Sequence, residues 1–238
     1  MLIDTVIEEE HFYHYFQPIF NINGQKVIGY EVLLRTSLFP NPVYTFQAAK
    51  EVKRLYELDS KSIKKAITTY YSSAIATEKL FLFINVFPSS IVNEAFDHFL
   101  EHLLRDNQIR KDQLVLEISE SELIEDPPLF RMHIERLKQQ GFHFALDDVG
   151  KGYANFDMMI DLEPNYIKLD RLFSYQLDQS KKKQNLIRFF LQYCKENDIK
   201  LILEGLETEE ELQVAKAVGI TYVQGFLLGK PAPIDNWE

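Results

Sequence analysis

Short apolar runs alternate with longer amphipathic stretches along the whole chain. The apolar runs have the length and the β-branched and aromatic content of buried strands, and the stretches between them repeat apolar residues at helical spacing. The predicted strands are Phe16–Phe20, Val27–Arg35, Leu80–Asn85, Leu114–Ser119, Phe142–Asp147, Tyr166–Leu169, Lys200–Leu203 and Tyr222–Gln224.

The helical patterns that fill most of the gaps are Phe46–Ser72, Ile91–Arg105, Leu129–Gln140, Asn185–Asn197 and Glu209–Val218. About eight strand–helix units in roughly 250 residues is the size of a (β/α)₈ TIM-type barrel, an α/β fold. The first two strands are joined only by residues 21–26, which is too short for a parallel crossover. The sequence therefore predicts a barrel whose first strand pair is antiparallel.

The pattern runs without a visible interruption, so we expect one barrel domain over residues 1–238. No Ser/Gly-rich linker or low-complexity segment suggests a boundary. The alternative is an open doubly wound sheet. That fold usually carries a Gly-rich phosphate loop after its first strand, and the chain has none at that point.

Seven of the predicted strands carry a polar residue at or near the carboxyl end. In a barrel these ends converge on one face, where active sites form. Any one of these residues, taken alone, is explained by the start of a solvated loop. Together they predict a site made of Glu31, Asn85, Glu117, the pair Asp147 and Asp148, Lys168, Glu204 and Gln224.

The predicted site is rich in carboxylates, and Lys168 is its one cation. Such a cluster repels itself unless a cation lies within it, and oxygen ligands in this number suit Mg²⁺ or Mn²⁺. Adjacent strand residues point to opposite faces, so Asp147 and Asp148 reach one site only if the strand ends between them. Gly150 and Gly152 permit that turn. A shared carboxylate beside a second one predicts two metal ions.

Composition limits which binding partners and which cellular compartment we expect for the protein. The formal net charge is -10, whereas proteins that bind DNA or RNA polymers are usually basic. The single cysteine, Cys194, excludes a disulfide framework. No run approaches the roughly 20 apolar residues of a membrane span, and the N-terminus lacks the basic start of a signal peptide. We expect a soluble cytoplasmic protein without membrane insertion.

A family resemblance adds to this interpretation. It rests on the motifs FQPIF, GYEVLLR, FINV, LEISES, LDDVGKGY, NYIKLDR, LEGLET and VQGFLLGKP, in this order. From about Phe16 to Pro231 the chain resembles the EAL domain, the cyclic di-GMP phosphodiesterase domain of bacterial signalling. The resemblance implies a (β/α)₈ barrel with an antiparallel first pair and a homodimer. It also implies hydrolysis of cyclic di-GMP to linear pGpG by water activated with two Mg²⁺ or Mn²⁺ ions.

The resemblance also implies roles for individual residues. The implied metal ligands are Glu31, Asn85, Glu117, Asp147 and, for the second ion, Asp148 together with Asp147. The implied catalytic residues are Lys168, which orients the attacking water, Glu204, a general base or water-positioning acid, Glu120, which anchors the loop after Asp148, and Asp148 itself. The implied substrate contacts are Arg35, which grips a phosphate, Gln224, beside the substrate, and Glu207 in a supporting place.

The chain departs from the family pattern at three motifs. Val32 replaces the alanine of the motif that names the family, and LEGLET stands for AEGVET. The loop DDFGTGYSSL of the family here contains Val149, Lys151, Ala154 and Asn155. In the family this loop couples metal binding to dimerisation, so its alteration bears on the second metal and on turnover. Two alternatives therefore stay open, a cyclic di-GMP receptor without turnover and a protein-interaction module. We expect the activity to be regulated by a protein partner or through the dimer interface.

Overall fold

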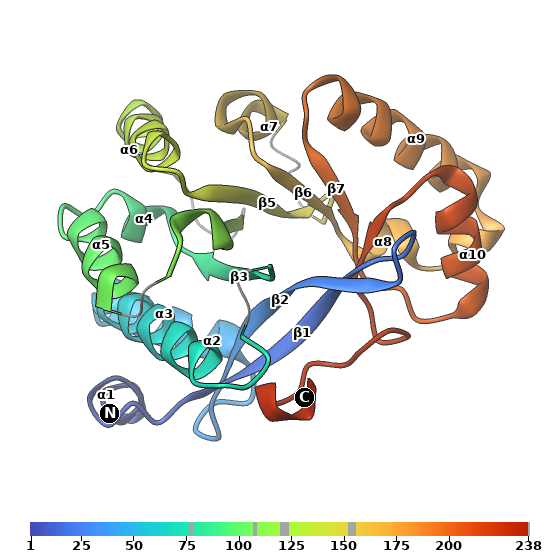
Figure 1. Cartoon of the computed structure of the whole chain (residues 1–238). Coiled ribbons are helices and arrows are strands. Elements are labelled where there is room, and N and C mark those ends of the chain that lie inside the picture. Colours follow the sequence, from blue (N-terminus) through green and yellow to red (C-terminus); the bar gives the residue numbers. More distant parts are fainter. Residues whose placement is uncertain (77–78, 107–108, 120–123, 152–155, 238) are drawn as a thin grey trace.

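The computed structural model places eight strands around one closed barrel in sequence order (Figure 1). It describes residues 1–76, 79–106, 109–119, 124–151 and 156–237, except for the side chains of residues 156 and 157. The strands are β1 Tyr13–Asn21, β2 Lys26–Arg35, β3 Phe81–Val86, β4 Leu114–Ser119, β5 His143–Val149, β6 Tyr166–Leu169, β7 Lys200–Leu203 and β8 Tyr222–Val223.

The first strand runs against both of its neighbours. β1 pairs antiparallel with β2 and, through Phe20 and Asn21, antiparallel with β8. All other neighbouring strands pair in parallel. The turn between β1 and β2 is held by the Asn21 side chain, whose Oδ1 accepts hydrogen bonds from the backbone of Asn23 and Gly24. The prediction of a (β/α)₈ barrel with an antiparallel first pair is confirmed.

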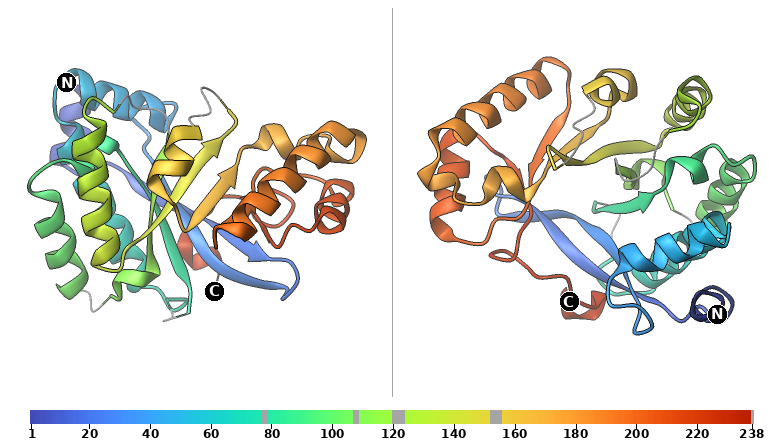
Figure 2. Two further views of the ribbon diagram at one scale, coloured as in Figure 1. Left: turned by 90° about the horizontal axis from the view of Figure 1, so that it is seen from above. Right: turned by 180° about the vertical axis from the view of Figure 1, so that it is seen from behind.

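Helices surround the barrel on the outside (Figures 1 and 2). Their bounds are α1 Leu2–Glu8, α2 Pro42–Glu51, α3 Leu55–Tyr71, α4 Pro88–Ile91, α5 Phe96–Asp106, α6 Pro127–Gln139, α7 Phe156–Leu162, α8 Arg171–Ser174, α9 Lys181–Glu196 and α10 Glu209–Val218. Local sequence sets some ends clearly. Thr208 and Glu211 form a capping box at the start of α10, and Gly219 ends it with a φ of 104°.

Two of the predicted helices are wrong in extent. The stretch Phe46–Ser72 divides into α2 and α3, because Lys53 takes a φ of 59° between them. The left-handed conformation cannot continue an α-helix. The stretch Ile91–Arg105 shares only Ile91 with α4, and its helical part begins with α5 at Phe96.

The barrel interior has an apolar layer from six strands. Its buried members are Ile19, Phe83, Val115, Ala145, Tyr166 and Ile202. A larger apolar core lies between the outer face of the sheet and the helices. Because side chains alternate between the two faces of a strand, the next residue facing the interior lies two positions further along. The apolar layer therefore forms a floor inside the barrel, and the interior residues two positions further along the parallel strands form the next layer above it.

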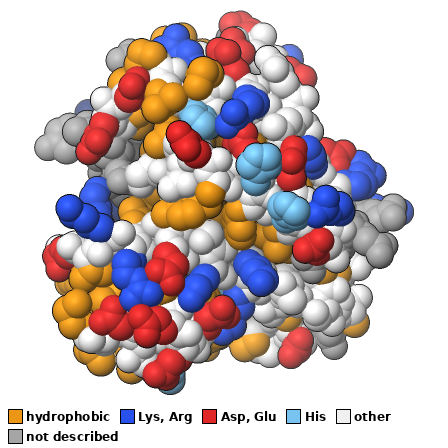
Figure 3. Space-filling model, turned by 90° about the vertical axis from the view of Figure 1, so that its left-hand side faces the viewer, with side chains coloured by type: hydrophobic (Ala, Val, Ile, Leu, Met, Phe, Trp, Pro, Cys, Tyr) orange, Lys and Arg blue, Asp and Glu red, His pale blue; other side chains and the backbone are white. Residues whose placement is uncertain are grey.

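Charges on one outer face are mixed. Figure 3 shows acidic and basic side chains interspersed with apolar ones on the side of the molecule where α5 and α6 lie. Arg136 of α6 forms an ion pair with Asp97 of α5 on these helices. Opposite charges thus offset one another on this face. In the described part of the chain, every helix falls short of the length or the apolar character that crossing a membrane requires.

Candidate active site

The predicted site residues form the layer directly above the apolar floor. Five of them follow a floor residue by two positions, as Asn85 follows Phe83 and Glu117 follows Val115. The same step leads from Ala145 to Asp147, from Tyr166 to Lys168 and from Ile202 to Glu204. On β1, which runs in the opposite direction, the step leads back from Ile19 to Gln17. Strand alternation alone therefore turns these polar side chains into the barrel mouth.

Lys168 lies at the centre of this layer. Its side chain is 0% exposed, and its Nζ lies 2.8 Å from Glu117 Oε1 and 2.9 Å from both Asp147 Oδ1 and Glu204 Oε1. Glu31 Oε2 is 3.3 Å away. One ammonium group thus faces four carboxylates that come from or directly follow four different strands. When all four are ionised, the set has three negative charges more than Lys168 balances.

Two side-chain amides fix the orientation of the carboxylates. Asn85 Nδ2 donates to Glu117 Oε2 at 3.3 Å. Gln224 Nε2 donates to Glu31 Oε2 at 2.5 Å and to Gln17 Oε1 at 3.1 Å. Seven of the eight predicted site residues therefore belong to one connected network of hydrogen bonds and ion pairs. Such a network holds its members in defined positions before any ligand arrives.

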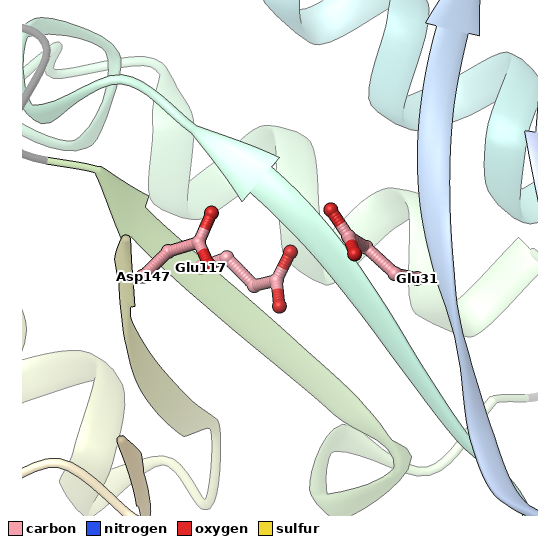
Figure 4. Close-up of side chains that lie close together, drawn as sticks. All are labelled: Glu31, Glu117 and Asp147. Atoms are coloured by element: carbon pink, nitrogen blue, oxygen red, sulfur yellow. The ribbon is translucent and has the colours of Figure 1, made fainter. Parts of the chain in front are cut away.

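Three of the carboxylates converge closely. Figure 4 shows Glu31, Glu117 and Asp147 projecting from β2, β4 and β5 toward a common point. One oxygen atom from each lies within 4.8 Å of the others. The site opens into a cavity of about 390 Å³ whose wall includes Glu31, Asn85, Asp147 and Asp148.

Burial and like charges raise the pKa values of two of these acids. Complete burial raises the pKa of Glu117 well above its usual range; Lys168 opposes this effect, whereas Glu31 and Asp147 add to it. Burial likewise raises the pKa of Glu204 to about 8, again against Lys168 and with Asp147 and Glu31. Burial alone would lower the pKa of Lys168, but the four carboxylates hold it well above its usual value. Without a further cation the site thus favours extra protons.

These residues fit a divalent cation. Glu117 Oε1 and Asp147 Oδ1 are buried and face the Lys168 ammonium, but neither accepts a well-aligned hydrogen bond from the described residues. Carboxylate oxygens with free lone pairs are the ligands that Mg²⁺ and Mn²⁺ prefer. The excess negative charge is also what a divalent ion would neutralise.

Asp148 reaches the cavity by a route that the sequence did not predict. The expectation that the strand ends between Asp147 and Asp148 is wrong, because β5 continues to Val149. Instead the pairing with β6 shifts register between Leu146 and Val149, and Asp148 takes a φ of 58°. This irregularity lets both aspartates line the same cavity. Burial raises the pKa of Asp148, and the Asp147 charge adds to this, while a hydrogen bond from Lys151 opposes it.

Two of the remaining predicted residues, Arg35 and Glu207, line cavities and bond to groups other than Lys168. Arg35 lines a larger cavity next to the first, and its Nη1 donates to the backbone oxygen of Leu34 at 2.8 Å. Glu207 lines the first cavity and pairs with Arg171 at 2.8 Å. Glu120 lies outside the described residues.

Several residues at the cavity were not predicted from the sequence. They are Gln17, Leu33, Asp170, Arg171, Gly205, Gly225 and Phe226. Gln17 carried a usable signal, because it is the one polar residue in the apolar run FQPIF. Phe226 gave no such signal, since an aromatic residue after a strand is indistinguishable from a core residue until its exposure, here 52%, is seen.

Curated relatives align with nearly the whole of this chain but are longer proteins. PdeI of Escherichia coli, a probable cyclic di-GMP phosphodiesterase, is 26% identical over 230 residues, which is 94% of this chain and 29% of PdeI. RocR of Pseudomonas aeruginosa, a cyclic di-GMP phosphodiesterase, is 27% identical over 231 residues, 95% of this chain and 59% of RocR. The chain therefore spans only part of the length of these relatives.

Solved structures show the same architecture. The complex of Klebsiella pneumoniae BlrP1 with calcium and cyclic di-GMP superimposes with a TM-score of 0.85 at 28% identity, over 93% of this chain and 56% of that one. A standalone EAL protein of Vibrio cholerae with bound cyclic di-GMP gives 0.82 at 26% identity, over 93% and 92% of the two chains. The EAL domain itself matches residues 2–231. With its closed barrel and its acidic mouth, this chain belongs to the EAL domain family.

Proposed function

We propose that this protein is a metal-dependent phosphodiesterase that hydrolyses cyclic di-GMP to linear pGpG. The observation that carries the proposal is the network in which Lys168 meets four carboxylates at the barrel mouth. The named activity of relatives such as RocR supports it. The reaction adds water to one phosphorus atom and breaks that atom's bond to a ribose 3′-oxygen, which leaves with a proton.

Divalent cations complete the site in this proposal. Glu31, Asn85, Glu117 and Asp147 would hold one ion, and Asp148 with Asp147 would hold a second. Bound Mg²⁺ or Mn²⁺ neutralises phosphate charge and lowers the pKa of water toward neutrality. The structure of BlrP1 with manganese and cyclic di-GMP supports this choice of cation.

Among the chain's own residues, Lys168 stabilises negative charge and Glu204 accepts a proton in this proposal. Lys168 is fully buried and keeps its proton, so its ammonium can orient water and stabilise negative charge that develops on the phosphate. Glu204 closes β7 beside it and has a carboxyl pKa of about 8 in the absence of other cations. Divalent ions bound beside it would favour the ionised carboxylate and lower this pKa, and the ionised form can accept a proton from water. Glu120, in the same proposal, supports the loop after Asp148.

The two adjacent cavities suit an elongated dinucleotide. They share Leu33, Asn85 and Asp148, so one ligand can extend from one into the other. Arg35, on the second cavity, would bind the phosphate that is not cleaved, for which a planar guanidinium is well suited. Gln224 and Glu207 line the first cavity, and the exposed ring of Phe226 offers a face for a guanine base.

The test is chromatography of the purified protein with cyclic di-GMP and either Mg²⁺ or Mn²⁺. We expect pGpG with the parent chain and a loss of at least about 100-fold in Glu31→Gln, since electrostatic groups of this kind contribute roughly that much or more. Glu210→Gln, an exposed acid outside the site, is the matched control and should keep full activity. Absence of pGpG with both ions, in a protein that remains folded, would contradict the proposal. Light scattering of the same samples tests the proposed homodimer.

A second candidate function is a cyclic di-GMP receptor without turnover. The observation that favours it is the ion pair between Lys151 and Asp148, because Lys151 replaces the uncharged residue of the family loop. A receptor would bind cyclic di-GMP in calorimetry and leave it intact. Formation of pGpG would exclude this candidate.

A further inference from the structure

Lys151 carries a positive charge to the edge of the candidate site. Its Nζ lies 2.8 Å from Asp148 Oδ2. Both residues belong to one turn, in which the Lys151 backbone N–H donates to the Asp148 carbonyl oxygen at 3.1 Å. The turn uses left-handed backbone at Asp148, with a φ of 58°, and at Gly150, with a φ of 98°. The ammonium is therefore tethered next to this carboxylate.

Gly150 holds the turn in this shape. A Cβ on Gly150 would lie 2.3 Å from Phe173 Cε2, and its φ is one that side chains rarely adopt. The turn in this conformation therefore requires glycine at position 150, because a side chain there would collide with Phe173. Non-glycine residues in left-handed backbone cost free energy and cluster at ligand sites. Asp148 is such a residue here.

Asp148 also lies where the two cavities meet. It lines both of them, while Lys151 lines only the larger one. Asp147 and Asp170 line the first cavity beside Asp148, and Arg171, which lines it too, pairs with Glu207. Among the described residues, Lys151 is thus the cation that forms an ion pair with Asp148, whereas Lys168 pairs with Glu117 and Asp147.

We propose that Lys151 is a built-in counterion for Asp148 that competes with the second divalent cation. This inference rests on the proposed function, because it assumes that Asp148 contributes to a metal site. In the metal-free protein the ammonium pairs with the carboxylate. The second ion binds Asp148 only when the Lys151 side chain swings away, so this site fills at higher metal concentration than the site formed with Glu31 and Glu117.

The exposure of Lys151 and Asp148 determines how strongly Lys151 weakens the binding of the second divalent ion. Lys151 is 62% exposed and Asp148 30%, so water screens their attraction. An exposed ion pair contributes about 1 kcal/mol or less, which corresponds to about fivefold in affinity. Repulsion between the ammonium and a divalent ion adds to this. We therefore expect the weaker metal site to bind about five- to tenfold more tightly once the charge of Lys151 is removed.

Mn²⁺ binding to the full chain, measured by electron paramagnetic resonance of free Mn²⁺ without nucleotide, tests the inference. Two affinity classes are expected in the parent. Lys151→Met should tighten the weaker class about five- to tenfold and leave the tighter class unchanged, whereas Lys151→Arg, which keeps the charge, should resemble the parent. Lys182→Met, at an exposed lysine of α9, is the matched control and should change neither class.

An unchanged weaker class in Lys151→Met would overturn the inference. A single affinity class in all variants would also overturn it, because Asp148 would then hold no second ion for Lys151 to oppose. Turnover is not part of this readout. A chain that binds two Mn²⁺ ions as expected but forms no pGpG contradicts the proposed hydrolysis and still supports the role of Lys151.

Discussion

Replacement of Lys168 by methionine tests the electrostatic logic of the site most directly. Methionine keeps a similar length and removes the ammonium that faces Glu31, Glu117, Asp147 and Glu204. An ion pair at about 4 Å contributes about 4 kcal/mol at an effective dielectric constant near 20. Loss of desolvation cost and uptake of protons by the carboxyls offset most of the four attractions. Removal of one partner from a buried ion pair typically costs about 3–5 kcal/mol, and we expect a loss of this size.

The loss should depend on divalent cations. In the presence of a chelator, Lys168→Met should lower the melting temperature by roughly 6–20 °C, since 1 kcal/mol corresponds to about 2–4 °C in a domain of this size. Added Mn²⁺ should stabilise the variant more than the parent, because the variant carries one more uncompensated negative charge at the site. A ligand that binds only the folded state contributes about 2.7 kcal/mol at 100 times its dissociation constant.

The assay is thermal and urea unfolding followed by circular dichroism, with chelator and with Mn²⁺. Lys182→Met is the control for loss of a lysine charge, and a change within about 0.5 kcal/mol is expected at this exposed position. If Lys168→Met unfolds like the parent in chelator, the ammonium of Lys168 does not stabilise the folded protein through its four carboxylate partners. That result would refute the charge balance described for the site.

Two further predictions concern pH and the loop after β5. In chelator, the folded state holds a proton on Glu204 up to a pKa of about 8, whereas the unfolded chain loses it near 4.5, so the free energy of unfolding should fall as pH rises between these values. Glu204→Gln should flatten this decline by up to about 1.4 kcal/mol per pH unit, measured by urea unfolding from pH 5 to 8; an equal slope in Glu204→Gln and Glu210→Gln would contradict it. Gly150→Ala should destabilise the protein by about 1–3 kcal/mol because its Cβ meets Phe173 at left-handed backbone. Gly24→Ala, which meets only ordinary contacts, should cost much less in the same melts, and equal losses would argue against a strained turn.

The strands were predictable because the local order of apolar and polar residues shows which strand residues are buried. The bounds of β4, β6 and β7 agree with the sequence prediction residue for residue, as do those of α10. These elements combine a clear apolar period with clear end signals, such as the capping box of α10. Period-2 alternation also fixed which residues share a layer, so the convergence of Glu117, Asp147 and Lys168 at one mouth followed from the barrel prediction.

Local pattern failed where backbone conformation depended on tertiary contacts. The break between α2 and α3 falls at Lys53, whose sequence context contains neither glycine nor proline. The break positions α2 over α1, with which it shares a separate apolar cluster. Asp148 is the second case, because the register shift against β6 and not a strand end turns it toward the cavity. Both residues take a left-handed conformation that a residue other than glycine disfavours, so local sequence gave no signal for either of them.

The sequence by itself determined the eight-stranded barrel, its antiparallel first pair and the acidic character of one end. Those features depend on the order and spacing of side chains along each strand. Only the tertiary structure decided which charges meet, since Lys168 lies among carboxylates that are far apart in the chain. It also decided that the ammonium of Lys151, although the side chain is 62% exposed, pairs with Asp148. Ion pairs depend on distances of a few ångströms, and those distances exist only after the chain has closed into the barrel.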